Sequence, residues 1–131
     1  MPVAVLDASA AVELLLGTGA GARADRALRG ETVAAPAHVD AEVLSALARL
    51  FREGAVAQER VERSVAALAR APVRRFPLPP LLVEAWALRA NLALRDALYV
   101  ALARRLGAAL VTADARLARA PELGIAVTVV G

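Results

Sequence analysis

Cysteine and lysine are absent from the 131 residues of this chain, and histidine occurs once, as His38. Without cysteine the chain can form no disulfide bond, thiolate metal site or cysteine nucleophile, which agrees with a reducing cytoplasm. Without lysine it lacks the residue that P-loops and Schiff-base enzymes require. A zinc site or a Ser-His-Asp triad would depend on His38 alone, so neither is adopted as an explanation of function.

Aromatic residues are also scarce, at 3% of the chain, whereas apolar residues make up 59%. The core must therefore consist mainly of alanine, valine and leucine. A chain of this length fits one domain, residues 1–131, with a substantial core. No charge-free stretch approaches the ~18 residues of a membrane span, so no membrane is expected and the location is predicted to be cytoplasmic. All sixteen basic residues are arginine, but the net charge of +3 is weak evidence for nucleic-acid binding.

Short apolar runs alternate along the chain with longer segments of helical periodicity. Mostly apolar strands that alternate with helices indicate a parallel sheet covered on both faces. The predicted fold is an α/β three-layer α/β/α sandwich with a central, mostly parallel sheet. The pattern predicts strands at residues 3–6, 32–35, 73–76, 108–112 and 126–130, and helices at 8–16, 22–29, 37–52, 55–70, 81–92, 95–106 and 114–119.

Four acidic residues lie at positions where an α/β fold could bring them together. Asp7 closes the first predicted strand and Asp114 follows the strand at 108–112. Carboxyl ends of parallel strands are where α/β folds place their chemistry. Asp96 opens the helix at 95–106 and Glu42 lies in the helix at 37–52, and both helices could face the same crevice.

Each of these acids also has an ordinary structural explanation. Asp7 and Asp114 suit helix N-caps, Asp96 suits the positive end of a helix dipole, and Glu42 suits a solvated helix face. Asp96 is the hardest to explain in this way. The ALYVALA sequence that follows it is apolar on every side of a helix, so the carboxylate should lie near the core, where it needs a partner.

A cluster of these carboxylates would need protons or a cation, because the negative charges repel one another. The chain offers almost only oxygen ligands, since cysteine is missing and histidine is nearly so. Oxygen ligands favour the hard cations Mg²⁺ or Mn²⁺.

Four short motifs carry a resemblance to a known family. They are DASA beginning at Asp7, EVLSAL at Glu42, DALYVALA at Asp96 and TADARL at Thr112. In this order and at these separations they resemble the PIN domain, specifically the VapC-type toxins of bacterial toxin–antitoxin pairs. The resemblance extends over essentially the whole chain.

The resemblance implies a metal-dependent endoribonuclease that uses Mg²⁺ or Mn²⁺ to hydrolyse RNA phosphodiester bonds. It also implies two partners besides RNA, a cognate VapB-type antitoxin and a second copy of the chain in a homodimer. The alternative of another class is a PIN-fold binding module without catalytic activity. The implied catalytic residues are Asp7, Glu42, Asp96 and Asp114, of which Asp7, Asp96 and Asp114 bind metal, with Ser9 and Thr112 in supporting roles.

An acidic crevice cannot attract RNA by itself, so arginines around it must hold the flanking phosphates. Arg95, Arg116 and Arg119 are the candidates closest to the acids in sequence. Aromatic side chains on which bases could stack are scarce. We therefore expect recognition of RNA shape and backbone rather than of bases.

Overall fold

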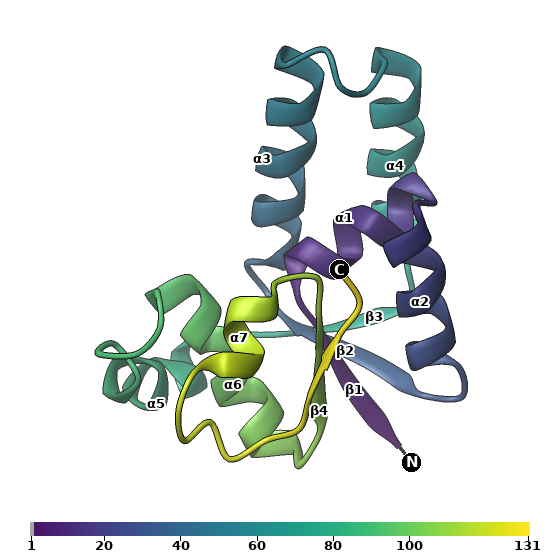
Figure 1. Ribbon diagram of the computed structural model, residues 1–131. Helices are drawn as coiled ribbons and strands as arrows, with labels where there is room; N and C mark the ends of the chain where they lie inside the picture. Colours follow the sequence, from purple (N-terminus) through teal and green to yellow (C-terminus); the bar gives the residue numbers. More distant parts are fainter. Residues whose placement is uncertain (1) are drawn as a thin grey trace.

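The computed structural model describes residues 2–131, in which five parallel strands form one sheet (Figure 1). All four strand pairings are parallel, so the sheet is more uniform than the mostly parallel one predicted. The order is β3-β2-β1-β4-β5, which places β1 in the centre. The strands are β1 (Val3–Leu6), β2 (Thr32–Pro36), β3 (Val73–Phe76), β4 (Ala109–Thr112) and β5 (Val127–Val129).

The central strands are almost completely buried, as their apolar sequences predict. Val5 and Leu110, paired across β1 and β4, have no exposed surface. Burial on both faces explains why these strands lack the alternation of polar and apolar residues seen in half-exposed sheets.

Four helices gather on one side of the sheet: α1 (Ala8–Leu16), α2 (Gly19–Leu28), α3 (Val39–Arg52) and α4 (Gln58–Arg70). Helix α1 packs against the other three. Helices α3 and α4 form a hairpin that projects beyond the sheet (Figure 1). The buried side chains of α3 are Val39, Val43 and Leu47, on the stripe that its periodicity indicates.

Helix α6 (Leu94–Leu106) covers the other side of the sheet by packing on β1, β2 and β4. A 3-10 turn η1 (Pro79–Leu81) leads into α5 (Leu82–Ala87), which packs against α6. Helix α7 (Ala115–Arg119) lies beside β5. The result is the predicted α/β/α sandwich.

The middle of helix α6 is buried on nearly every side, as the apolar ALYVALA segment predicts. Tyr99 is 1% exposed and Val100, Ala101, Leu102 and Ala103 are fully buried. The N-terminal turn that carries Asp96 therefore lies close to the core.

Some helix boundaries differ from the sequence prediction. Helix α5 ends at Ala87 rather than near residue 92, because the chain turns through 88–91 to bury Leu88 against the core. Helix α2 begins at Gly19, three residues early, because the Thr18 side chain caps it by accepting a hydrogen bond from the Gly21 N–H. Within residues 2–131, no helix combines the length and the apolarity needed to cross a bilayer.

Candidate active site

The strand order creates a crevice at the carboxyl ends of β1 and β4. From β1 the chain moves to β2 and β3 on one side, whereas β4 and β5 lie on the other. Such a switch point leaves a gap between the two sets of connections, where ligands of open α/β sheets bind. Asp7 directly follows β1, and Asp114 lies two residues beyond the end of β4.

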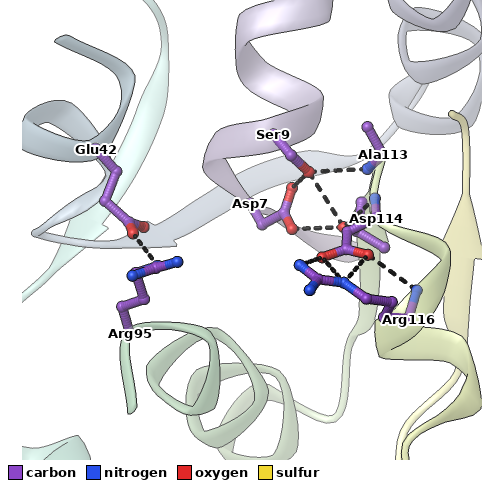
Figure 2. A network of polar contacts seen from close by, with 8 residues as sticks. Asp7, Ser9, Glu42, Arg95, Ala113, Asp114 and Arg116 are labelled. Carbon is purple, nitrogen blue, oxygen red and sulfur yellow. Dashed lines mark hydrogen bonds and ion pairs between the residues drawn. The ribbon is translucent and has the colours of Figure 1, made fainter. Parts of the chain in front are cut away.

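Asp7 is only 5% exposed, and both of its carboxylate oxygens accept hydrogen bonds (Figure 2). Oδ1 accepts from the Ser9 hydroxyl at 2.7 Å and from the Ala10 N–H at 3.0 Å, while Oδ2 accepts from the Thr112 hydroxyl at 2.5 Å. Burial raises the pKa of Asp7, and the three donors oppose this rise. Asp7 caps α1 and also lines the crevice, so its role as a helix cap does not remove the carboxylate from the cavity.

Ser9 and Thr112 join the loops that follow β1 and β4. The Ser9 hydroxyl oxygen accepts a hydrogen bond from the Ala113 N–H at 3.0 Å, and the Thr112 hydroxyl oxygen accepts one from the Asp114 N–H at 3.0 Å. Both hydroxyls donate to Asp7, and each makes one hydrogen bond between the two loops: Ser9 accepts from Ala113, and Thr112 donates to Asp7. This fixes the position of Asp7 relative to Asp114.

Asp114 is held by its neighbour Arg116. The carboxylate caps α7 by accepting from the Arg116 N–H at 2.9 Å, and it also accepts from the Arg116 guanidinium, with a shortest distance of 2.7 Å. This charged hydrogen bonding lowers the pKa of Asp114. Asp114 is thus ionised, and a guanidinium already compensates its charge.

Asp96 contrasts with Asp114, because no residue in 2–131 forms a hydrogen bond or ion pair with its side chain. It lies in the first turn of α6 and is half-buried. Burial raises the pKa of Asp96; Arg95 opposes the rise, whereas the charges of Glu42 and Asp114 add to it. A carboxylate in this position favours a proton or a cation as its partner.

Glu42 reaches the crevice from α3 and has three polar neighbours. Its Oε1 accepts a hydrogen bond from the Tyr99 hydroxyl at 2.7 Å and lies 3.4 Å from His38 Nε2. Its Oε2 lies 3.6 Å from Arg95 Nε. Figure 2 shows Glu42 and Arg95 facing each other across from the group formed by Asp7 and Asp114. Glu42 is thus an oriented, mostly covered side chain rather than a solvated one.

All four predicted acids line a single cavity of about 630 Å³. Four separate segments supply them, namely the β1–α1 junction, α3, α6 and the β4–α7 loop. The cavity is also lined by Ser9, Arg95 and Arg116. Thr112 is fully buried and does not line it. Arg119 lies outside it.

The acids share the cavity without forming a closed metal cage. Across the described chain, no group of three or more acidic, histidine or cysteine side chains is gathered tightly enough to hold a metal ion. Glu42 is drawn toward Tyr99 and Arg95, and Asp114 toward Arg116. The donor set itself, carboxylate oxygens around an open cavity, is nevertheless of the kind that Mg²⁺ and Mn²⁺ bind.

Among the cavity-wall residues that sequence reasoning missed are three with large polar side chains: His38, Arg49 and Tyr99. Tyr99 is one turn beyond Asp96, and Arg49 is two turns beyond Glu42 on the same helix. The helical spacing from each acid was the signal that could have identified them. The His38 ring packs on Tyr99 with centroids 4.8 Å apart, beneath Glu42.

Comparison with known proteins places this geometry in a family. The PIN domain family profile matches residues 4–123. Ribonuclease VapC12 of Mycobacterium tuberculosis is 48% identical over 115 residues, which cover 88% of this chain and 89% of the relative.

Two solved structures have the same fold. PAE2754 from Pyrobaculum aerophilum superposes with a TM-score of 0.72 at 25% identity, covering 98% of this chain and 84% of that one. VapBC2 from Rickettsia felis, solved bound to a DNA fragment from its promoter, gives a TM-score of 0.68 at 15% identity, covering 95% of this chain and 96% of that one. The profile match, together with a relative that is nearly half identical over most of its length, shows that this chain belongs to the PIN domain family and, within it, to the VapC proteins.

Proposed function

We propose that this protein is a VapC-type endoribonuclease that hydrolyses RNA phosphodiester bonds with the help of Mg²⁺ or Mn²⁺. The observation that carries the proposal is the convergence of Asp7, Glu42, Asp96 and Asp114 from four segments on one cavity. The cavity lies at the switch point of a parallel sheet, where α/β enzymes bind their ligands. The name of the relative VapC12, Ribonuclease, supports RNA as the substrate.

Asp7, Asp96 and Asp114 are the residues that would hold the metal ion. Asp96 supports this assignment most directly, because its half-buried carboxylate has no partner among the residues that the structure describes. When bound, a divalent ion supplies a water of lowered pKa and compensates the charge that develops on the phosphate.

The protein side chains then have separate roles. Ser9 and Thr112 hold the Asp7 carboxylate in one orientation through their hydroxyl groups. Glu42 or Asp114 would accept the proton of the attacking water, because both carboxylates line the cavity. Arg95 and Arg116 border the same space and can compensate phosphate charge.

The proposed partners follow from the family. A VapB-type antitoxin would hold the protein in a cytoplasmic complex, and a second copy would form a homodimer. Exposed apolar side chains offer surface for such contacts, above all on α5, where Leu82 is 52%, Val83 86% and Trp86 58% exposed.

The test is RNA cleavage by the purified protein with Mn²⁺, with Mg²⁺ or with EDTA, on total RNA followed by mapping of the cut ends. We expect cleavage only with a metal ion, and its loss in Asp7→Asn and Asp96→Asn. Asp25→Asn is the matched control, because Asp25 lies on α2 and pairs only with Arg29.

Two results would contradict the proposal. Cleavage that persists in EDTA, or in both active-site variants, would exclude the metal mechanism. RNA binding without cleavage under every metal condition would instead favour the alternative of a binding module.

A further inference from the structure

Three arginines line the acidic cavity, and they differ in what they contact. Arg116 is hydrogen-bonded to Asp114, and Arg95 lies beside Glu42. The third, Arg49, forms no side-chain hydrogen bond or ion pair with any residue in 2–131. Carboxylates thus already compensate two of the guanidinium charges, whereas the charge of Arg49 is available to a ligand.

Arg49 lies on the same face of α3 as Glu42, because seven residues make nearly two helical turns. Along the helix axis the separation is about 10 Å. Between them, the small side chains of Ser45 and Ala46 line the cavity and leave the space above the helix open. The cavity therefore extends from the acids along α3 as far as Arg49. Helix α3 is one arm of the projecting hairpin that it forms with α4 (Figure 1).

A guanidinium is well suited to a backbone phosphate, which it can bind through two parallel N–H groups. Arg49 lines the part of the cavity that lies about two turns of α3 beyond Glu42. A chain that binds across the acids and follows the cavity along α3 would pass this guanidinium.

We propose that Arg49 binds a backbone phosphate of single-stranded RNA that flanks the cleaved one, and so sets the path of the RNA along α3. The inference depends on the proposed function, since it assigns a position to the substrate of that same cavity. It makes Arg49 a binding residue rather than a catalytic one.

The first measurement is affinity for a fluorescein-labelled single-stranded RNA of about 16 nucleotides, followed by fluorescence anisotropy in the non-cleaving Asp7→Asn background. With Arg49→Gln we expect weaker binding, and a slope of log affinity against log salt that is shallower by about 0.7, the loss of one phosphate contact. Arg63→Gln is the matched control, since Arg63 is an exposed arginine of α4 outside the cavity.

The second measurement locates the contact on a mapped, cleaved oligonucleotide. Single phosphates around the cut are replaced one at a time by neutral methylphosphonates, and cleavage is compared between the wild-type protein and Arg49→Gln. We expect one flanking position at which the replacement raises KM for the wild-type protein and has no further effect in the variant. The kcat of Arg49→Gln should stay close to that of the wild type.

The outcomes separate this inference from the proposed function. If the wild-type protein cleaves RNA, but Arg49→Gln keeps the wild-type KM and the salt slope of Arg63→Gln, the role of Arg49 is refuted and the function stands. If the wild-type protein cleaves no RNA with Mn²⁺ or Mg²⁺, the proposed function fails and the role of Arg49 fails with it. A lowered kcat with unchanged KM in Arg49→Gln would also overturn the inference.

Discussion

The Tyr99 hydroxyl donates a 2.7 Å hydrogen bond to Glu42 Oε1, which joins α6 to α3 across the floor of the acidic cavity. Burial and this bond both raise the pKa of Tyr99, so the hydroxyl keeps its proton and serves as a fixed donor. The two residues are far apart in sequence and neither helix alone would orient the glutamate. Tyr99 thus sets the direction in which Glu42 presents its carboxylate.

Removing this hydroxyl should affect cleavage more than stability. In Tyr99→Phe the ring still fills its site, and the partly exposed Glu42 keeps its contacts with His38 and Arg95. Water can replace the lost donor, so the charge stays solvated while the carboxylate loses its fixed direction. We expect kcat to fall about tenfold or more, with only a small change in the midpoint of thermal unfolding. An unchanged kcat would show that Glu42 needs no orientation from Tyr99.

The pH dependence of stability should reveal the unpaired carboxylate of Asp96. Because its pKa is raised in the fold, the folded protein binds this proton more tightly than the unfolded chain does. This contribution to the free energy of unfolding is therefore present below the unfolded pKa near 3.8 and is lost as pH rises through the folded value.

Asparagine does not ionise, so Asp96→Asn should remove the fall in the free energy of unfolding that the Asp96 carboxyl causes as pH rises. In EDTA the variant should equal the wild type near pH 4 and be more stable near pH 7.5, by less than about 1 kcal/mol because the group stays partly hydrated. Thermal unfolding at a series of pH values measures the difference. Addition of Mn²⁺ should stabilise the wild type but not the variant. A variant that is less stable than the wild type by a constant amount at every pH would refute the electrostatic explanation.

Thr112 should contribute more to the stability of the fold than its small side chain suggests. The residue is fully buried, and its hydroxyl both donates to Asp7 and accepts from the Asp114 N–H. Thr112→Val keeps the shape but leaves both partners without their bond, so we expect a loss of about 1–3 kcal/mol in urea unfolding. Thr128→Val, at an exposed position of β5, is the control and should have almost no effect. Equal stabilities of the two variants would contradict this reasoning.

A pair of glycines in α2 offers a test of the packing of α2 against α1. A Cβ at Gly21 would lie 2.1 Å from the Glu13 carbonyl oxygen, whereas at Gly19 the nearest atom would be 3.7 Å away on a flexible arginine. Gly21→Ala should therefore destabilise the fold by about 1–3 kcal/mol or more. Gly19→Ala should be neutral or stabilise it by up to about 1 kcal/mol, because alanine favours the helix. Urea unfolding of both variants measures the difference. Similar midpoints would count against the close contact of Gly21 with the Glu13 carbonyl.

The sequence predicted the sheet well because the central strands β1 and β4 are almost entirely apolar, as burial on both faces requires. It also predicted the burial of the Asp96 turn, because the ALYVALA segment that follows is apolar on every side. Helix ends were less predictable. The glycines at the start of α2 indicated a turn, and the capping by Thr18 that overrides them depends on local geometry.

Within the site, convergence of the acids could be anticipated from strand ends, but their partners could not. The contacts of Glu42 with Tyr99 and Arg95 depend on how α3 and α6 are rotated against each other. Arg49 could not be distinguished from the other helix arginines, because sequence does not show which face borders a cavity. The roles of the acids and the single-domain organisation stay predictions.

The bond between Asp7 and Thr112 spans 105 positions of the chain. During synthesis, β1 leaves the ribosome long before β4, which later inserts beside it and supplies Thr112 and Asp114. The acidic cavity therefore cannot form until the segment that carries Thr112 and Asp114 has emerged. Until then Asp7 ends a strand whose neighbour on one side is still missing.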